Sequence, residues 1–140
     1  MMSTIDQQLP SQLKEDTIYV CERSIFSSFN VFTDLTKMSN QEAFMIKTIY
    51  DGYKKTNMSD GIIFINSSPK ISLNRAISRG HPSDNQLTLE KIEYIHQRYQ
   101  TWLEQSDLPV YYIDQSDVLK LSPKNIIESA IRFFEGEKNK

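Results

Sequence analysis

Asp60-Gly-Ile-Ile-Phe-Ile-Asn66 is the stretch that decides the fold, because a short continuous apolar run between polar ends is typical of a strand buried on both faces. Ser68-Pro69 follows at once and predicts a helix, with serine as its N-cap and proline at its first position. Gly80 marks the expected end of that helix, since glycine readily adopts the left-handed conformation found there. A strand that leads directly into a helix is the repeating unit of an α/β fold.

The same order of strand and helix recurs along the chain. Thr17-Ile-Tyr-Val-Cys21 and Pro109-Val-Tyr-Tyr-Ile113 are predicted as two more buried strands. Ser39 and Glu42 form a capping box at the start of a long helix, in which each side chain satisfies the other residue's free amide. Further helices are expected from their apolar spacing and caps, so that the predicted helical ranges are 5–13, from about 29, 39–55, 69–79, 87–105 and 123–134. We therefore expect one α/β domain whose parallel sheet is flanked by helices.

Length and composition restrict the class of protein. The 140 residues are enough for one domain with a genuine core, and the formal net charge of −2 argues against a general nucleic-acid-binding protein. Cys21 is the single cysteine, so an internal disulfide is excluded and a reducing compartment is indicated. No apolar run approaches the length of about eighteen residues that a membrane span needs, and the N-terminus is polar. We expect a soluble, cytoplasmic protein.

A charged turn follows the first predicted strand, at Glu22-Arg23-Ser24. In a parallel sheet, ligands bind at the carboxyl ends of the strands. A carboxylate there can bind Mg²⁺, while a guanidinium can neutralise charge on a reacting oxygen. The alternative is a structural ion pair that fixes the turn, and the residues alone do not decide between the two.

Two arginines lie near the end of the helix that precedes Gly80. Arg75 and Arg79 are four residues apart and therefore share one helix face. Arginines held on a transferring phosphoryl group can accelerate transfer by roughly 10³–10⁵. The simpler alternative is that these cations only complement the helix dipole, and for the pair taken alone it is the stronger one.

Aromatic residues follow the charged turn at Phe29 and Phe32. Either ring could stack on a nucleobase, a contact worth roughly 1–3 kcal/mol, or belong to the core. Tyr99 and Trp102 recur at helical spacing, so we expect both in the core.

Together these segments resemble the deoxynucleoside kinases, which have the P-loop kinase fold. The resemblance runs over about residues 8–134. It rests on Glu22-Arg-Ser-Ile-Phe-Ser27 with Phe32, on Asp60-Gly-Ile-Ile-Phe-Ile with its helix and Arg75-x-x-x-Arg79-Gly80, on Leu89-Glu90 through Trp102-Leu103, and on Asp114-Gln-Ser-Asp117-Val118. The implied fold is a parallel α/β sheet of the P-loop kinase type.

The resemblance implies an activity in nucleotide salvage, transfer of the ATP γ-phosphoryl group to the 5′-hydroxyl of a deoxynucleoside with Mg²⁺. A nucleoside monophosphate kinase similar to thymidylate kinase is an alternative, since it shares the fold and the lid arginines. The Glu-Arg-Ser turn with Phe32 disfavours that alternative. A non-catalytic remnant that binds a nucleotide or a partner chain is the alternative from another class.

The resemblance also implies roles for individual residues. The residues expected to take part in catalysis are Glu22, Arg23, Arg75 and Arg79, with Glu22 as the Mg²⁺ ligand. The residues expected on the nucleoside are Arg23, Ser28, Phe32 and Asp84. The residues expected on ATP are Arg75, Arg79, Asp117 and Val118. In this family Phe32 would stack on the base, Asp84 would accept a hydrogen bond from the sugar 3′-hydroxyl, and the helix from Ser39 would offer a homodimer interface.

One family motif is absent from the 140 residues, the phosphate-binding loop Gly-x-x-x-x-Gly-Lys-Ser/Thr. The strand before that loop and the glutamate that deprotonates the 5′-hydroxyl are missing with it, and His81 stands where another lid arginine is usual. We therefore expect the C-terminal portion of a deoxynucleoside kinase domain. Such a portion would be a gene fragment, a mispredicted start, or half of a split enzyme that needs a complementary N-terminal chain.

The 140-residue chain alone should transfer no phosphoryl group, because the missing loop and base supply the positioning and most of the charge stabilisation. Purified chain would be incubated with Mg-ATP and each deoxynucleoside, and monophosphate measured by chromatography. Turnover near about 1 s⁻¹, the lower end for kinases, would contradict this expectation.

Overall fold

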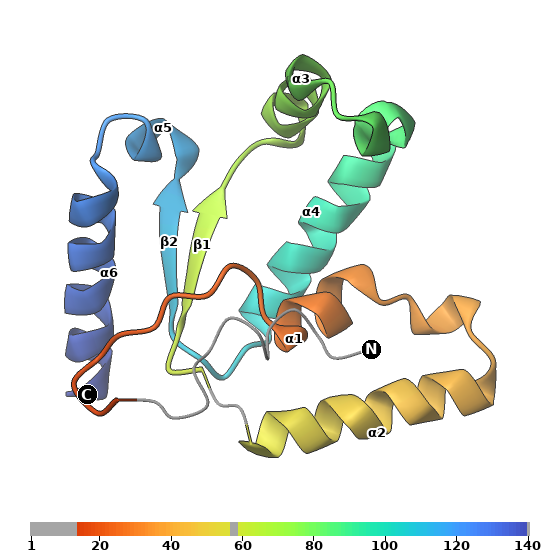
Figure 1. Ribbon diagram of the computed structural model, residues 1–140, viewed down its shortest axis with the longest axis horizontal. Coiled ribbons are helices and arrows are strands. Elements are labelled where there is room, and N and C mark those ends of the chain that lie inside the picture. Colours follow the sequence, from red (N-terminus) through yellow and green to blue (C-terminus); the bar gives the residue numbers. More distant parts are fainter. Residues whose placement is uncertain (1–13, 57–58, 140) are drawn as a thin grey trace. The chain divides into compact units, whose positions relative to one another are not determined.

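The computed structural model describes residues 14–56 and 59–139 (Figure 1). The chain divides into two compact units, residues 1–58 and residues 59–140, and each is described by itself. The expected helix over residues 5–13 lies outside the described residues. The expectation that all 140 residues form a single domain stays a prediction.

The first unit is helical within its described residues. It contains α1 (Ile25–Ser27), the π-helical turn η1 (Ser28–Phe32), the 3₁₀ turn η2 (Leu35–Lys37) and the long helix α2 (Asn40–Thr56). The predicted capping box is confirmed, because the Ser39 amide donates to the Glu42 carboxylate at 2.9 Å and the Glu42 amide donates to Ser39 Oγ at 3.4 Å. The helix predicted over 39–55 is therefore confirmed to within a residue.

The strand predicted over Thr17–Cys21 is wrong. These residues have no regular secondary structure, Ile18 is 63% exposed and Val20 is 61% exposed. Cys21, predicted as a buried strand thiol, is only half-buried. A β-rich sequence becomes a strand only where a neighbour completes its hydrogen bonds, and the described residues give this segment none.

The second unit carries a parallel sheet of two strands, β1 (Ile62–Asn66) and β2 (Val110–Asp114). The register pairs Ile62 with Val110 at one end and Asn66 with Asp114 at the other. The helical elements that accompany the sheet are α3 (Pro69–Arg79), η3 (Pro82–Gln86), α4 (Leu89–Glu104), α5 (Gln115–Val118) and α6 (Pro123–Lys138). The α/β class is confirmed, although the described residues form two strands where the sequence predicts three.

The ends of α3 follow the sequence signals. Ser68 accepts a hydrogen bond from the Ile71 amide at 3.4 Å, and Gly80 adopts the left-handed conformation with φ of 64°. The predicted loop after Gly80 is instead largely a 3₁₀ turn, η3, and α6 continues four residues past its predicted end at Phe134. The other predicted boundaries of the second unit agree within about two residues. In the first unit, the helical segment predicted from about residue 29 begins four residues earlier, at Ile25.

Helices cover both faces of the sheet (Figure 1). On one face Phe64 contacts Tyr99 of α4, with ring centroids 5.6 Å apart. On the other face Tyr111 contacts Phe133 of α6, with centroids 5.4 Å apart. Tyr99 and Trp102 are half-buried rather than fully in the core.

The expectation that β1 is fully buried is wrong, because Ile65 is 50% exposed. Ile113, its partner in register, is only 5% exposed. The two residues lie on the same face, so α6 covers β2 more completely than β1. A strand is buried on both faces only where helices span the whole width of the sheet.

Gly61→Ala should destabilise the second unit by about 1–3 kcal/mol, because the added Cβ would overlap the Phe134 ring. Gly136→Ala in α6 is the matched control, since its Cβ meets nothing within 4 Å and should stabilise by about 0.5–1 kcal/mol. Urea unfolding followed by the fluorescence of the single tryptophan, Trp102, measures both. An unchanged midpoint for Gly61→Ala would mean that the Phe134 ring moves aside freely.

Candidate functional site

Two predicted site residues of the second unit bind each other directly. Asp84 Oδ2 accepts hydrogen bonds from Arg79 Nε at 3.0 Å and from Arg79 Nη2 at 2.7 Å. The left-handed Gly80 ends α3 and lets the chain turn into η3, which brings Asp84 back to the last residue of α3. The Asp84 side chain is 12% exposed and that of Arg79 is 67% exposed. Arg79 thus carries a carboxylate partner, while much of its guanidinium faces solvent.

Arg75 has a different partner, the side chain of Gln115. Gln115 is 6% exposed and begins α5 directly after β2. With its amide oriented to satisfy the surrounding hydrogen bonds, its carbonyl oxygen accepts from the Arg75 guanidinium and its NH₂ group donates to Ser67 Oγ. Ser72 Oγ donates to the same Ser67 oxygen at 3.1 Å. We call Ser67, Ser72, Arg75 and Gln115 the strand-end cluster.

The strand-end cluster lies where α/β sheets bind ligands. Ser67 follows β1, Gln115 follows β2, and α3 and α5 both lie beyond the carboxyl ends of the strands (Figure 1). Ser67 and Gln115 were not singled out as site residues from the sequence. Their position directly after two of the predicted strands is the signal that could have identified them.

Asp117 and Val118, which are expected on ATP, lie in the short helix α5. A shallow pocket of about 250 Å³ lies beside it, lined by Tyr111, Tyr112, Ile113, Asp114, Asp117, Lys120 and Leu121. Asp117 is exposed and lies 3.9 Å from the ammonium of Lys120, whereas Val118 is half-buried and does not line the pocket. Hydrogen bonds from Ser116, including its amide at 2.8 Å, hold the pKa of the Asp114 carboxyl below its usual value. Asp114 is the N-cap of α5.

Four predicted site residues, Glu22, Arg23, Ser28 and Phe32, belong to the first unit. Arg23 has φ of 64°, the left-handed conformation that is uncommon outside glycine and that often occurs at functional sites. Its guanidinium carbon lies 5.4 Å from the centroid of the Phe32 ring, and Phe32 is 48% exposed. In the described part of the chain, Glu22 and Arg23 form no ion pair with each other, so this structure does not contain the purely structural pair considered from the sequence.

Phe29 and Phe32 differ in their surroundings. Phe29 stacks on Tyr50 of α2 with ring centroids 3.9 Å apart and planes inclined by 10°. Asn30 donates to the Tyr50 hydroxyl at 3.1 Å, so Tyr50 joins η1 to α2. Phe29 is therefore half-buried and packs against α2 within the first unit. Phe32 and Ser28 lie in the π-helical turn η1, a rare geometry that is frequent at functional sites.

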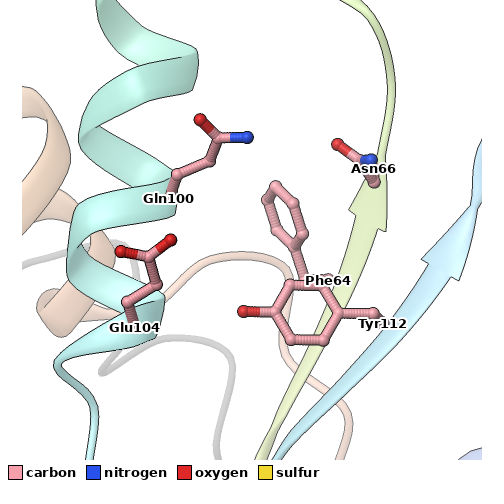
Figure 2. Close-up of a pocket in the computed structure, with 5 residues that line it drawn as sticks. All are labelled: Phe64, Asn66, Gln100, Glu104 and Tyr112. Carbon is pink, nitrogen blue, oxygen red and sulfur yellow. The ribbon is translucent and has the colours of Figure 1, made fainter.

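A second shallow pocket, of about 240 Å³, lies between α4 and the sheet (Figure 2). The rings of Phe64 and Tyr112 project from the strands, while Gln100 and Glu104 project from α4 toward them (Figure 2). Asn66 completes the lining. None of these residues is among the predicted site residues.

Few side chains of the described residues are placed to bind Mg²⁺. Within residues 14–56 and 59–139, no three His, Cys, Asp or Glu side chains gather as a metal site would require. Mg²⁺ at kinase sites is commonly bound by one or two carboxylates together with substrate phosphates and water. The exposed carboxylate of Glu22 fits the role of such a single protein ligand.

No helix among the described residues combines the length and the apolar character that crossing a membrane requires.

Comparisons with known proteins agree with the fold. A family model described as deoxynucleoside kinase matches residues 1–133. Deoxycytidine kinase of Mus musculus is 26% identical over 155 aligned residues, which cover 94% of this chain and 60% of that protein. Deoxycytidine kinase 1 of Xenopus laevis is 23% identical, with coverage of 76% and 44%, and a probable deoxycytidine kinase of fowlpox virus is 26% identical, with coverage of 63% and 40%.

The chain spans about half the length of these curated relatives, between 40% and 60%. The family model, by contrast, matches all but the last seven of the 140 residues of this chain. Since that match extends over far more than half of the chain, the protein belongs to the deoxynucleoside kinase family.

Proposed function

We propose that these residues form part of an enzyme that transfers the γ-phosphoryl group of ATP to the 5′-hydroxyl of a deoxynucleoside. The observation that supports this most is the arrangement of two arginines on α3 in a chain of this family. Arg75 is held at the carboxyl ends of the strands, and Arg79, one turn further along, is paired with Asp84. Guanidinium groups suit the planar oxygens of phosphates, and charge stabilisation is the main contribution of protein to phosphoryl transfer.

The pairing of Arg79 with Asp84 suggests how one segment would contact both substrates. Arg79 uses Nε and Nη2 toward Asp84, which leaves further N–H donors for ATP phosphates. Both of these bonds end on Oδ2, so Oδ1 of Asp84 is the oxygen proposed to accept the sugar 3′-hydroxyl. Asp84 would then orient Arg79 and bind the nucleoside at the same time.

The remaining predicted residues are proposed to have the roles that the family resemblance implies. Glu22 would hold Mg²⁺, which when bound neutralises charge on the phosphates. Arg23 would bind near the 5′-oxygen, Phe32 would stack on the base, and Ser28 would influence base choice. Asp117 and Val118 would contact the adenine of ATP. The relatives are named as deoxycytidine kinases, so deoxycytidine is the first nucleoside to test.

The cellular setting is proposed on the same basis. A single cysteine and the absence of a long apolar segment in the sequence favour a cytoplasmic enzyme of nucleotide salvage. Its partners would be ATP and the nucleoside, with a homodimer or a complementary N-terminal chain as the proposed assembly.

Transfer should be measured in a protein that supplies a phosphate-binding loop in addition to these residues. With deoxycytidine and Mg-ATP, we expect deoxycytidine monophosphate to form and Arg79→Ala to lower kcat by roughly 10³. Arg132→Ala is the matched control, because Arg132 is exposed on α6 and its Nε only donates to the Glu128 carbonyl at 3.4 Å. Trp102 fluorescence would check that both variants stay folded. Equally small effects of the two substitutions would contradict a role of Arg79 in transfer.

Asp84→Ala tests the sugar contact, with deoxycytidine compared with its 3′-deoxy analogue. We expect kcat/KM to fall more for deoxycytidine by roughly tenfold to a hundredfold, the equivalent of about 1.5–3 kcal/mol for a hydrogen bond to a charged group. The ratio isolates the 3′-hydroxyl, because displacement of Arg79 would affect both nucleosides alike. Equal losses for the two would show that Asp84 only orders the segment around Arg79.

A further inference from the structure

We propose that Gln115 is a positioning residue that holds the guanidinium of Arg75 in place for the ATP phosphates. The proposal rests on the proposed function and extends it to a residue outside the predicted site. Gln115 touches Arg75 and Ser67, and it lies on the same short helix as Asp117 and Val118. It would therefore act on ATP through Arg75 rather than by contact with the reacting atoms.

The burial of Gln115 restricts the conformations that its side chain can adopt. Gln115 is 6% exposed, while the following residues Ser116 and Asp117 are exposed. A buried amide left without partners is costly, so both ends of the side chain need a hydrogen bond. Ser67 accepts at one end and Arg75 donates at the other, which fixes the Gln115 side chain between the ends of the two strands.

The chemistry of the partner distinguishes Arg75 from Arg79. Arg79 is bound by a carboxylate, which compensates much of its charge, whereas Gln115 is neutral and leaves the charge of Arg75 intact. A neutral acceptor can therefore orient a guanidinium without competing with an anionic ligand. Arginine has a long side chain with high rotamer entropy, and presetting its head group lowers the ordering cost of binding a polyphosphate.

The contact is tested first in the chain without any ligand. The guanidinium protons of Arg75 would be followed by ¹⁵N NMR and assigned by their loss in Arg75→Lys. In the unmodified chain, we expect the Arg75 protons to exchange with water roughly tenfold more slowly than those of exposed Arg132. In Gln115→Ala, we expect the Arg75 protons to exchange as fast as those of Arg132. Gln115→Glu keeps an acceptor for Arg75, so slow exchange should be restored even if the alanine variant folds poorly. Fast exchange in the unmodified chain, or slow exchange in Gln115→Ala, would overturn the proposal.

Mg-ATP is then titrated onto the same variants in a protein that also supplies a phosphate-binding loop, with the Arg75 resonances as the readout. We expect Gln115→Ala to weaken binding roughly tenfold, and Gln115→Glu to weaken it as well, because its carboxylate would neutralise Arg75. Gln97→Ala on the exposed part of α4 is the matched control and should bind as the unmodified chain does. Unchanged binding in both Gln115 variants would overturn the positioning role. Loss of slow exchange in Gln115→Ala, together with no ATP response in any variant, would leave the contact standing and refute the proposed function instead.

Discussion

The parallel pairing of β1 with β2 is the constraint on which the rest of the second unit depends. Its register places Asn66 beside Asp114, so the residues that follow the two strands meet although they are far apart in sequence. Ser67 and Gln115 hydrogen-bond there only because this register brings both strand ends level. A shift of either strand by one residue would turn its own ring, Phe64 or Tyr112, away from α4 and would separate the strand-end cluster.

The two arginines of α3 are held by hydrogen-bond partners of different charge. The spacing of Arg75 and Arg79 puts both on one helix face, yet each meets a partner of different charge. Gln115 leaves Arg75 fully charged, whereas Asp84 holds Arg79 through a charge-assisted pair of hydrogen bonds. Under the proposed function, the first arrangement would favour a fixed phosphate contact and the second a contact that also responds to the nucleoside.

The first unit has its own organising contact, the stack of Phe29 on Tyr50. It fixes η1 against α2 and leaves Phe32, three residues on, partly exposed beside Arg23. Phe29 of the turn thus packs against α2, whereas the Phe32 ring is about half exposed. The left-handed Arg23 at the start of this segment adds the kind of backbone strain that structures tolerate at functional sites.

The sequence by itself determined the local elements and the family. The capping box at Ser39, the start of α3 at Ser68 and its end at Gly80 depend on contacts within a few residues, and all three were predictable. Tertiary structure decided the features that depend on residues distant in sequence, which are strand pairing, burial and the contacts between side chains. Thr17–Cys21 has the composition of a strand, but the described residues provide no strand for it to pair with. Ile65 has the composition of a core residue, but no helix among the described residues covers it fully. The pairing of Arg75 with Gln115, forty residues apart in sequence, likewise follows from strand register rather than from any local signal.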